Sequence, residues 1–253
     1  MSTKRFSALL QGISPGRLAY LRPFLLAFLL LNAALRLGLA GAGLDHFSWG
    51  VLPALLIGVV FDLGVFAYMA LPLVLLLFLW PRGWALALHR LLVVLAFLAC
   101  LVWLFVAFSE VTFWNEFASR FNFIAVDYLI YTNEVVGNIR ESYNLPLLLG
   151  GVAAGATLMG LLLVWGLSRQ KAEAQSGKPL GWALGLWLAL PLLAFVGLHA
   201  QYKEFSSDAQ VNELAGNGYF DFVHAFNVNE IDYPRFYKTL PAAEASTELA
   251  HEL

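Results

Sequence analysis

Five long apolar stretches constrain what this chain can fold into more than any other feature. A helix of about 20 apolar residues crosses the hydrocarbon core of a bilayer, and each stretch has roughly that length. Because lipid offers no hydrogen-bond partners to the backbone, stretches of this kind cross membranes as helices. We therefore expect an all-α fold, a polytopic membrane bundle of five transmembrane helices. The stretches cover residues 23–41, 51–80, 91–108, 145–167 and 180–198.

The composition agrees with a membrane protein. Hydrophobic residues make up 60% of the chain and charged residues 13%, whereas a soluble domain carries about 25% charged residues. The single cysteine, Cys100, lies inside the third stretch and has no second cysteine to pair with. No basic surface interleaved with aromatic residues indicates nucleic-acid binding. The partner that the composition predicts is a phospholipid membrane.

The order of the segments predicts a topology. Residues 1–22 precede the bundle, residues 23–199 form it, and residues 200–253 make a polar tail. Lys and Arg near the ends of the stretches are concentrated on the side of the N-terminus, which the positive-inside rule places in the cytoplasm. An odd number of crossings then puts the tail outside the cell membrane, where its last residues, from Pro241 on, read as a linker. If one stretch were interfacial or re-entrant, everything after it would change sides.

Two charged residues lie within the apolar stretches. Arg36 falls near the outer end of the first stretch and Asp62 within the second. Charged side chains inside a membrane are costly, and they usually pair or face the interior of the bundle. Arg36 and Asp62 therefore predict an intramembrane ion pair that fixes the packing of two helices. In the alternative interpretation, Asp62 is an acid that faces a substrate.

The outside segment 110–144 carries apolar residues at helical spacing. Phe121, Ile124 and Tyr128 begin this pattern, which predicts one outside amphipathic helix over residues 120–143 that lies flat on the membrane. Its polar positions either line a site for a lipid headgroup or form a docking surface for whatever follows in the chain. The candidate residues are Asp127, Tyr131, Glu134, Asn138 and Glu141.

No catalytic or metal-binding motif is recognisable in the sequence. The five histidines are scattered over different segments, and no His/Cys spacing suggests a metal site. A Gly-rich phosphate loop and a nucleophile elbow are also missing. The carboxylates of Asp208, Glu213 and Asp221 show no spacing that defines a site, and the Asp221–His224 pair reads as surface polarity.

Three stretches outside the apolar runs resemble a known family. They are RFNFIAVDYLIYTNEVVGNIRESY (120–143), NELAGNG (212–218) and NEIDYPRFY (229–237). They are similar to the Gram-negative branch of the lipoteichoic acid synthase-like family, which are membrane-bound phosphoglycerol transferases of the sulfatase/alkaline phosphatase superfamily. Phe61-Asp62-Leu63 also resembles a motif of the second span, although Val60 stands where arginine is common.

The resemblance implies a five-span module that tethers a periplasmic sulfatase-like catalytic domain in the inner membrane. That domain carries a threonine nucleophile and a divalent metal, usually manganese, and no residue of this sequence matches those positions. We therefore expect residues 1–253 to be inactive alone, and we expect an anionic lipid headgroup to be the substrate that the protein meets. The alternative is a small transporter or membrane-assembly subunit without an enzymatic domain.

Overall fold

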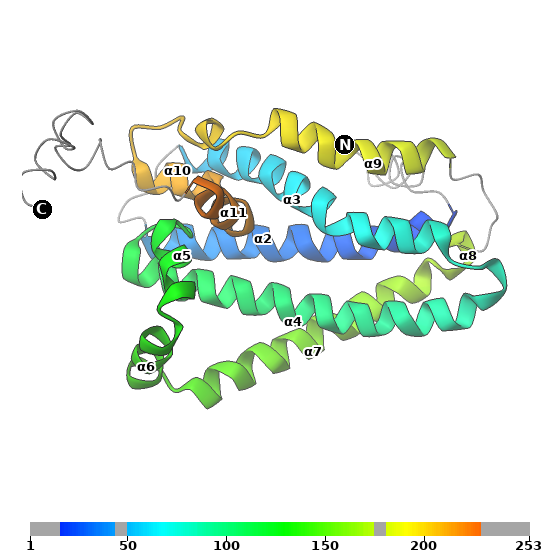
Figure 1. The fold of residues 1–253 in the computed structure, drawn as a ribbon, viewed down its shortest axis with the longest axis horizontal. Coiled ribbons are helices and arrows are strands. Elements are labelled where there is room, and N and C mark those ends of the chain that lie inside the picture. The colour runs from blue at the N-terminus through cyan, green and yellow to red at the C-terminus, as the bar shows by residue number, and fades with distance from the viewer. Residues whose placement is uncertain (1–15, 44–49, 175–180, 229–253) are drawn as a thin grey trace, which may run out of the picture.

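The structure is a computed structural model that describes residues 16–43, 50–174 and 181–228 (Figure 1). Every regular element in these ranges is a helix. The fold is therefore the expected all-α polytopic bundle. The linker expected from Pro241 on, and the stretch 229–237, lie outside the described residues.

Five helices run along the long axis of the molecule and alternate in direction (Figure 1). Four are long and apolar enough to cross a membrane, and the fifth, α9, has 17 residues, the lower limit for a crossing. α9 packs along α3. The five are α2 (Leu21–Gly43), α3 (Val51–Leu79), α4 (Ala85–Phe117), α7 (Leu145–Arg169) and α9 (Gly181–Gly197).

Short elements gather at the two ends of this bundle (Figure 1). At one end, called here the capped end, lie α5 (Phe123–Ile130), α6 (Thr132–Ser142), η3 (Ala200–Lys203), α10 (Ala209–Ala215) and α11 (Gly218–Val228). At the other, called the basic end, lie η1 (Gly16–Tyr20), η2 (Arg82–Trp84) and α8 (Lys171–Ala174). The described segment after the last long helix therefore lies at the same end as α5 and α6.

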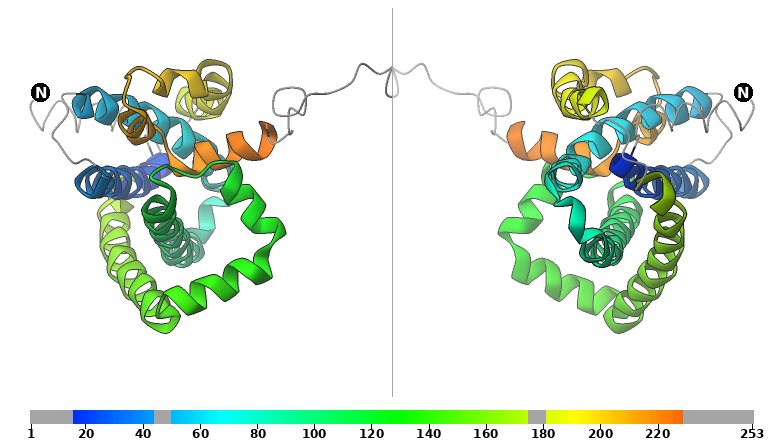
Figure 2. Two further views of the ribbon diagram at one scale, coloured as in Figure 1. Left: turned by 90° about the vertical axis from the view of Figure 1, so that its left-hand side faces the viewer. Right: turned by 90° about the vertical axis from the view of Figure 1, so that its right-hand side faces the viewer.

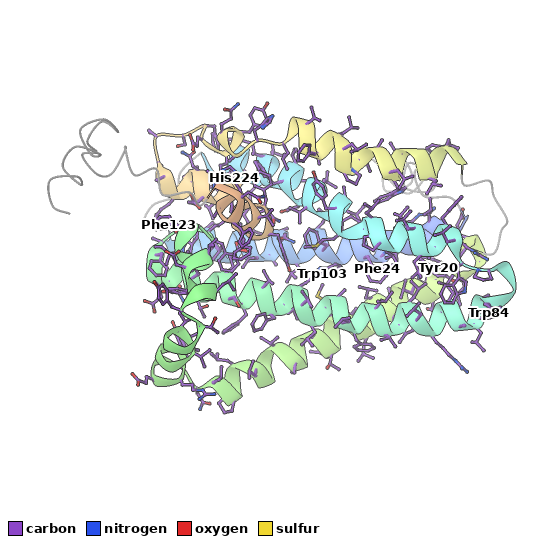
Figure 3. All side chains as sticks on the ribbon, viewed as in Figure 1. Tyr20, Phe24, Trp84, Trp103, Phe123 and His224 are labelled. Carbon is purple, nitrogen blue, oxygen red and sulfur yellow. The ribbon has the colours of Figure 1, made fainter. Side chains whose placement is uncertain are left out.

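Aromatic side chains fill the middle of the bundle. The ring of Phe28 lies 5.2 Å from that of Trp103, and the ring of Phe66 lies 6.2 Å from that of Trp187. Figure 3 shows Phe24 and Trp103 in this central region, with Trp84 and Phe123 at opposite ends. Close approach of α7 to α4 depends on Gly160, because a Cβ there would lie 2.7 Å from Cε1 of Phe97.

The outside segment departs from the prediction in two ways. α4 continues to Phe117, so residues 110–117 belong to a long helix, which ends at Ala118 in the left-handed conformation (φ 50°). The single amphipathic helix expected over 120–143 is instead two helices that meet at Tyr131. Side-chain hydrogen bonds explain the boundaries: Asn122 Oδ1 accepts from Ile124 N (2.9 Å), and Thr132 Oγ1 donates to Leu129 O (2.7 Å).

Candidate functional site

The segment after α9 folds back into the capped end of the bundle. Val211, Leu214 and Ala215 of α10 are fully buried, and they pack with apolar residues of α2, α3 and α4. The side chain of Asp208 caps α10 by accepting from Gln210 N (2.9 Å). The described part of the tail, which the sequence suggested to be a juxtamembrane segment leading to a linker, is therefore packed into the membrane bundle.

Arg36 of α2 makes the first polar contact between the bundle and this segment. Its guanidinium donates to both carboxylate oxygens of Asp62 on α3, at 3.0 and 2.9 Å. It also donates to the backbone carbonyls of Leu214 (2.8 Å) and Gly216 (3.0 Å). Arg36 and Asp62 are each only 1% exposed. One arginine thus joins two spans to the chain between α10 and α11, and the sequence-based pair is formed.

Asn217 extends this contact and starts α11. Its Nδ2 donates to Asp62 Oδ1 (2.8 Å) and to Asn32 Oδ1 (3.2 Å). Its Oδ1 accepts from the backbone N of Tyr219 (3.0 Å), as an N-cap side chain does. The same amide therefore caps a helix and satisfies polar groups of α2 and α3 that the lipid could not satisfy.

Arg120 makes a second, separate contact. It forms a buried ion pair with Glu110 of α4, and both side chains are almost completely shielded from solvent. Its Nε donates to the carbonyl of Glu213 (2.9 Å), and its backbone N donates to Oε2 of Glu213 (3.0 Å). The turn after α4 is thereby fastened to α10. Together the two arginines bind the backbone carbonyls of Glu213, Leu214 and Gly216, at the C-terminal end of α10.

Glycines leave the room that these buried charges occupy. A Cβ at Gly58 of α3 would lie 2.6 Å from Nη2 of Arg36, and one at Gly218 would lie 2.6 Å from Cδ of Glu110. Asp221 lies equally close to Gly216. A side chain at any of the three positions would displace an ionic group. Gly216 and Gly218 are therefore needed to make room for Asp221 and Glu110, in addition to forming a turn.

Lys203 completes the cluster at its outer edge. Its Nζ lies 2.9 Å from Oδ1 of Asp221 and 3.5 Å from Oε1 of Glu213. Burial lowers the pKa of Lys203, but the two carboxylates outweigh this effect and hold the pKa above its usual value. Burial raises the pKa of Asp221 above its usual value, against the opposing attraction of Lys203 and Arg120.

Of the candidates predicted in the outside segment, Asp127, Tyr131 and Glu141 do not join this cluster. Asp127 is half-buried, whereas Tyr131 and Glu141 are exposed. No hydrogen bond links the side chains of these three residues in the part of the chain that the structure describes, and the side chains of Glu134 and Asn138 lie outside it. The structure thus shows no hydrogen-bonded site formed by Asp127, Tyr131 and Glu141.

Sequence reasoning missed most of the cluster. Asp221, interpreted as surface polarity with His224, is buried and bound to Lys203, while His224 is exposed and stacks on Phe220. The available signals were Glu110 following an apolar run and the two glycines around Asn217. The residues missed are Glu110, Arg120, Lys203, Glu213, Asn217 and Asp221.

The contacts of the cluster join different segments of this one chain to each other. Each of its charged groups is held by an opposite charge or by backbone carbonyls. Among the described residues, no group of three His, Cys, Asp or Glu could hold a metal ion. The geometry is that of a clamp, which holds the segment leading out of the bundle in one orientation. We call it the arginine clamp, meaning Arg36 and Arg120 with their partners.

Comparison with known proteins gives no match. No family model, no curated protein and no solved structure matches the chain. The helical fold, its membrane-spanning helices and the arginine clamp are thus the grounds for a functional proposal.

Proposed function

We propose that this chain is the membrane-anchoring module of a lipoteichoic acid synthase-like phosphoglycerol transferase. It holds, at the outer face of a cell inner membrane, a sulfatase-like catalytic domain that follows in the full-length protein. The observation that carries the proposal is the arginine clamp. A module that only crossed the membrane would have no need to fasten the segment after its last span to α2, α3 and α4 through buried charges.

The distribution of basic residues supports the proposed orientation. The positive-inside rule places the end richer in Lys and Arg in the cytoplasm. Among the described residues at the capped end, Arg36 and Arg120 are buried in ion pairs, which leaves Arg140 and Lys203. The basic end has Arg17, Arg22, Arg82, Arg90, Arg169 and Lys171. The capped end then faces the periplasm, and α11 leads outward to the catalytic domain.

The same contacts weigh against a transporter. A transporter needs polar groups that line a path and exchange partners with its cargo. Arg36 and Asp62 instead bind each other and the backbone of the C-terminal segment. Their hydrogen bonds are those of a fixed contact between helices and chain.

Two experiments test the proposal. The reading frame beyond the Leu253 codon should encode several hundred residues with sulfatase-type metal ligands; a stop codon there, without a neighbouring catalytic gene, would favour a subunit without enzymatic domain. Residues 1–253, reconstituted in nanodiscs that contain phosphatidylglycerol, should release no glycerol phosphate. Measurable release by this chain would contradict the assignment of the chemistry to another domain.

A further inference from the structure

The helices α5 and α6 carry an unpartnered apolar face. Ala125 and Val126 of α5 point into the protein and are buried. α5 nevertheless exposes the apolar side chains of Phe123 (58%) and Leu129 (59%), and α6 continues the exposed apolar surface with Val136 and Ile139. Apart from Asp127, the other seven residues of α5 are apolar or aromatic. A helix of this composition has no polar side to turn towards water.

α5 and α6 lie across the direction of the spans. Figure 2 looks along the bundle, so that the spans are seen end-on, while α5 and α6 are seen from the side as an arc between α4 and α7. Their exposed face continues directly into α7, whose first turns expose Leu147 (71%) and Leu149. Since α7 spans the membrane, its exposed leucines face lipid. The arc of α5 and α6 joins α7 at the depth of these leucines.

We propose that α5 and α6 are embedded in the interfacial layer of the bilayer, with their apolar face against the acyl chains. The aromatic residues fit this depth. Tyr131 is 60% exposed and Tyr128 partly so, and amphipathic rings of this kind gather where acyl chains meet headgroups. Arg140 and Glu141 of α6 are exposed as well, and they lie at headgroup level.

In this position the arc of α5 and α6 has a structural role that does not depend on the proposed enzymatic function. A lipid-embedded arc fixes the depth of the capped end in its leaflet. It also fixes the height of α11, because α5 packs against α11 and the ring of Phe121 lies 6.1 Å from that of Phe222. A change in the depth of α5 in the lipid would therefore also move α11, after which the chain leaves the bundle.

Site-directed spin labels test the placement directly. In a Cys100→Ala background, single cysteines replace Leu129 and Ile139 on the apolar face, Glu141 on the polar face, and Leu161, a lipid-facing reference on α7. Each labelled protein is studied in nanodiscs with oxygen, which partitions into lipid, and with a water-soluble nickel chelate. Labels at Leu129 and Ile139 should collide more often with oxygen than with nickel, as at Leu161, and the label at Glu141 should do the reverse.

Two results would overturn the proposal. Collision with the nickel chelate at Leu129 as frequent as at Glu141 would place α5 in water. Protection of Leu129 and Ile139 from both reagents would show that protein, either a second copy or a following domain, covers the face. Because the labelled side chains are exposed, their replacement leaves the packed core intact, and the melting temperature of the unlabelled Cys100→Ala protein, in which a buried side chain is changed, verifies the fold of the background.

Discussion

The middle of the bundle and its capped end are held together by different forces. In the middle, aromatic rings of α2, α3 and α4 pack around Phe28 and Trp103. At the capped end, Arg36 and Arg120 bind carboxylates and backbone carbonyls. In a membrane, apolar side chains contact lipid almost as favourably as other helices, so apolar packing alone selects partners weakly. Buried charges have no such substitute, and they determine which segments meet.

The two regions therefore differ in how sharply they specify the structure. Removing one partner from a buried ion pair costs about 3–5 kcal/mol, because the other charge is left uncompensated. Replacing an apolar side chain by another of similar volume usually costs below about 1.5 kcal/mol. Substitutions at the capped end should accordingly do more damage than substitutions in the middle.

The largest effect is expected for Arg36→Met. The variant leaves the buried carboxylate of Asp62 without its opposite charge and removes the hydrogen bonds to the carbonyls of Leu214 and Gly216, at a cost of about 3–5 kcal/mol. The yield of monodisperse protein in detergent and its melting temperature should both drop steeply. The double variant Arg36→Met/Asp62→Leu removes both charges and should recover part of the loss. An unchanged melting temperature in Arg36→Met would contradict the claim that the capped end is more sensitive to substitution than the middle of the bundle.

Asp62→Asn is a gentler change at the same place. The amide keeps the shape of the side chain but lacks the negative charge and one of the two oxygens that accept from Arg36, at a cost of about 2–3 kcal/mol. In the full-length protein, the variant should lower the amount of folded protein more than the transfer rate per folded molecule. Normal abundance with lost transfer would instead make Asp62 an acid that faces the substrate.

Gly58→Ala and Gly218→Ala separate the space around the arginine clamp from its charges. Each added methyl group would press on an ionic group, on Arg36 or on Glu110, and overpacking of this kind costs about 1–3 kcal/mol. Gly150→Ala on α7 is the matched control, since a Cβ there meets open space. Melting temperatures should fall for the first two and hold or rise slightly for the control. Equal behaviour of all three would show that the contacts are not tight.

Phe28→Leu probes the apolar middle. The substitution loosens the ring contacts with Phe66 and Trp103 and should cost about 1 kcal/mol. The melting temperature should therefore fall less than in Arg36→Met. A larger loss in Phe28→Leu would reverse the order of the two regions.

Lys203→Gln should give the smallest effect, about 1 kcal/mol or less, because this ion pair lies at the edge of the cluster. The pKa of Lys203 is raised in the folded protein, so its contribution is complete below its pKa of about 10.4 in the unfolded chain and disappears as the pH rises through the folded-state pKa. The difference in melting temperature from the wild type should be present near pH 8 and shrink at strongly alkaline pH. A difference that grows with pH would contradict this sign.

The fold was accessible from the sequence because lipid imposes helices on apolar stretches, whose length is fixed by the bilayer. The pair Arg36–Asp62 was accessible for a related reason, since two opposite charges in neighbouring spans have few other partners. The break at Tyr131 was not, because a threonine hydroxyl that bonds back to the preceding turn, as Thr132 does to Leu129 O, can bend a helix without disturbing its hydrophobic periodicity. Glu213 binds Arg120, which lies 93 residues earlier in the chain, and no local sequence pattern predicts such a contact.

The central claim is that α10 and α11 are fastened into the membrane bundle by buried arginines. Hydrogen exchange, measured by mass spectrometry on the protein in nanodiscs, tests it without any substitution. Peptides from residues 209–221 should be protected nearly as long as those of α2 and α3. Rapid exchange of residues 209–221, with the peptides of α2 and α3 still protected, would contradict the claim.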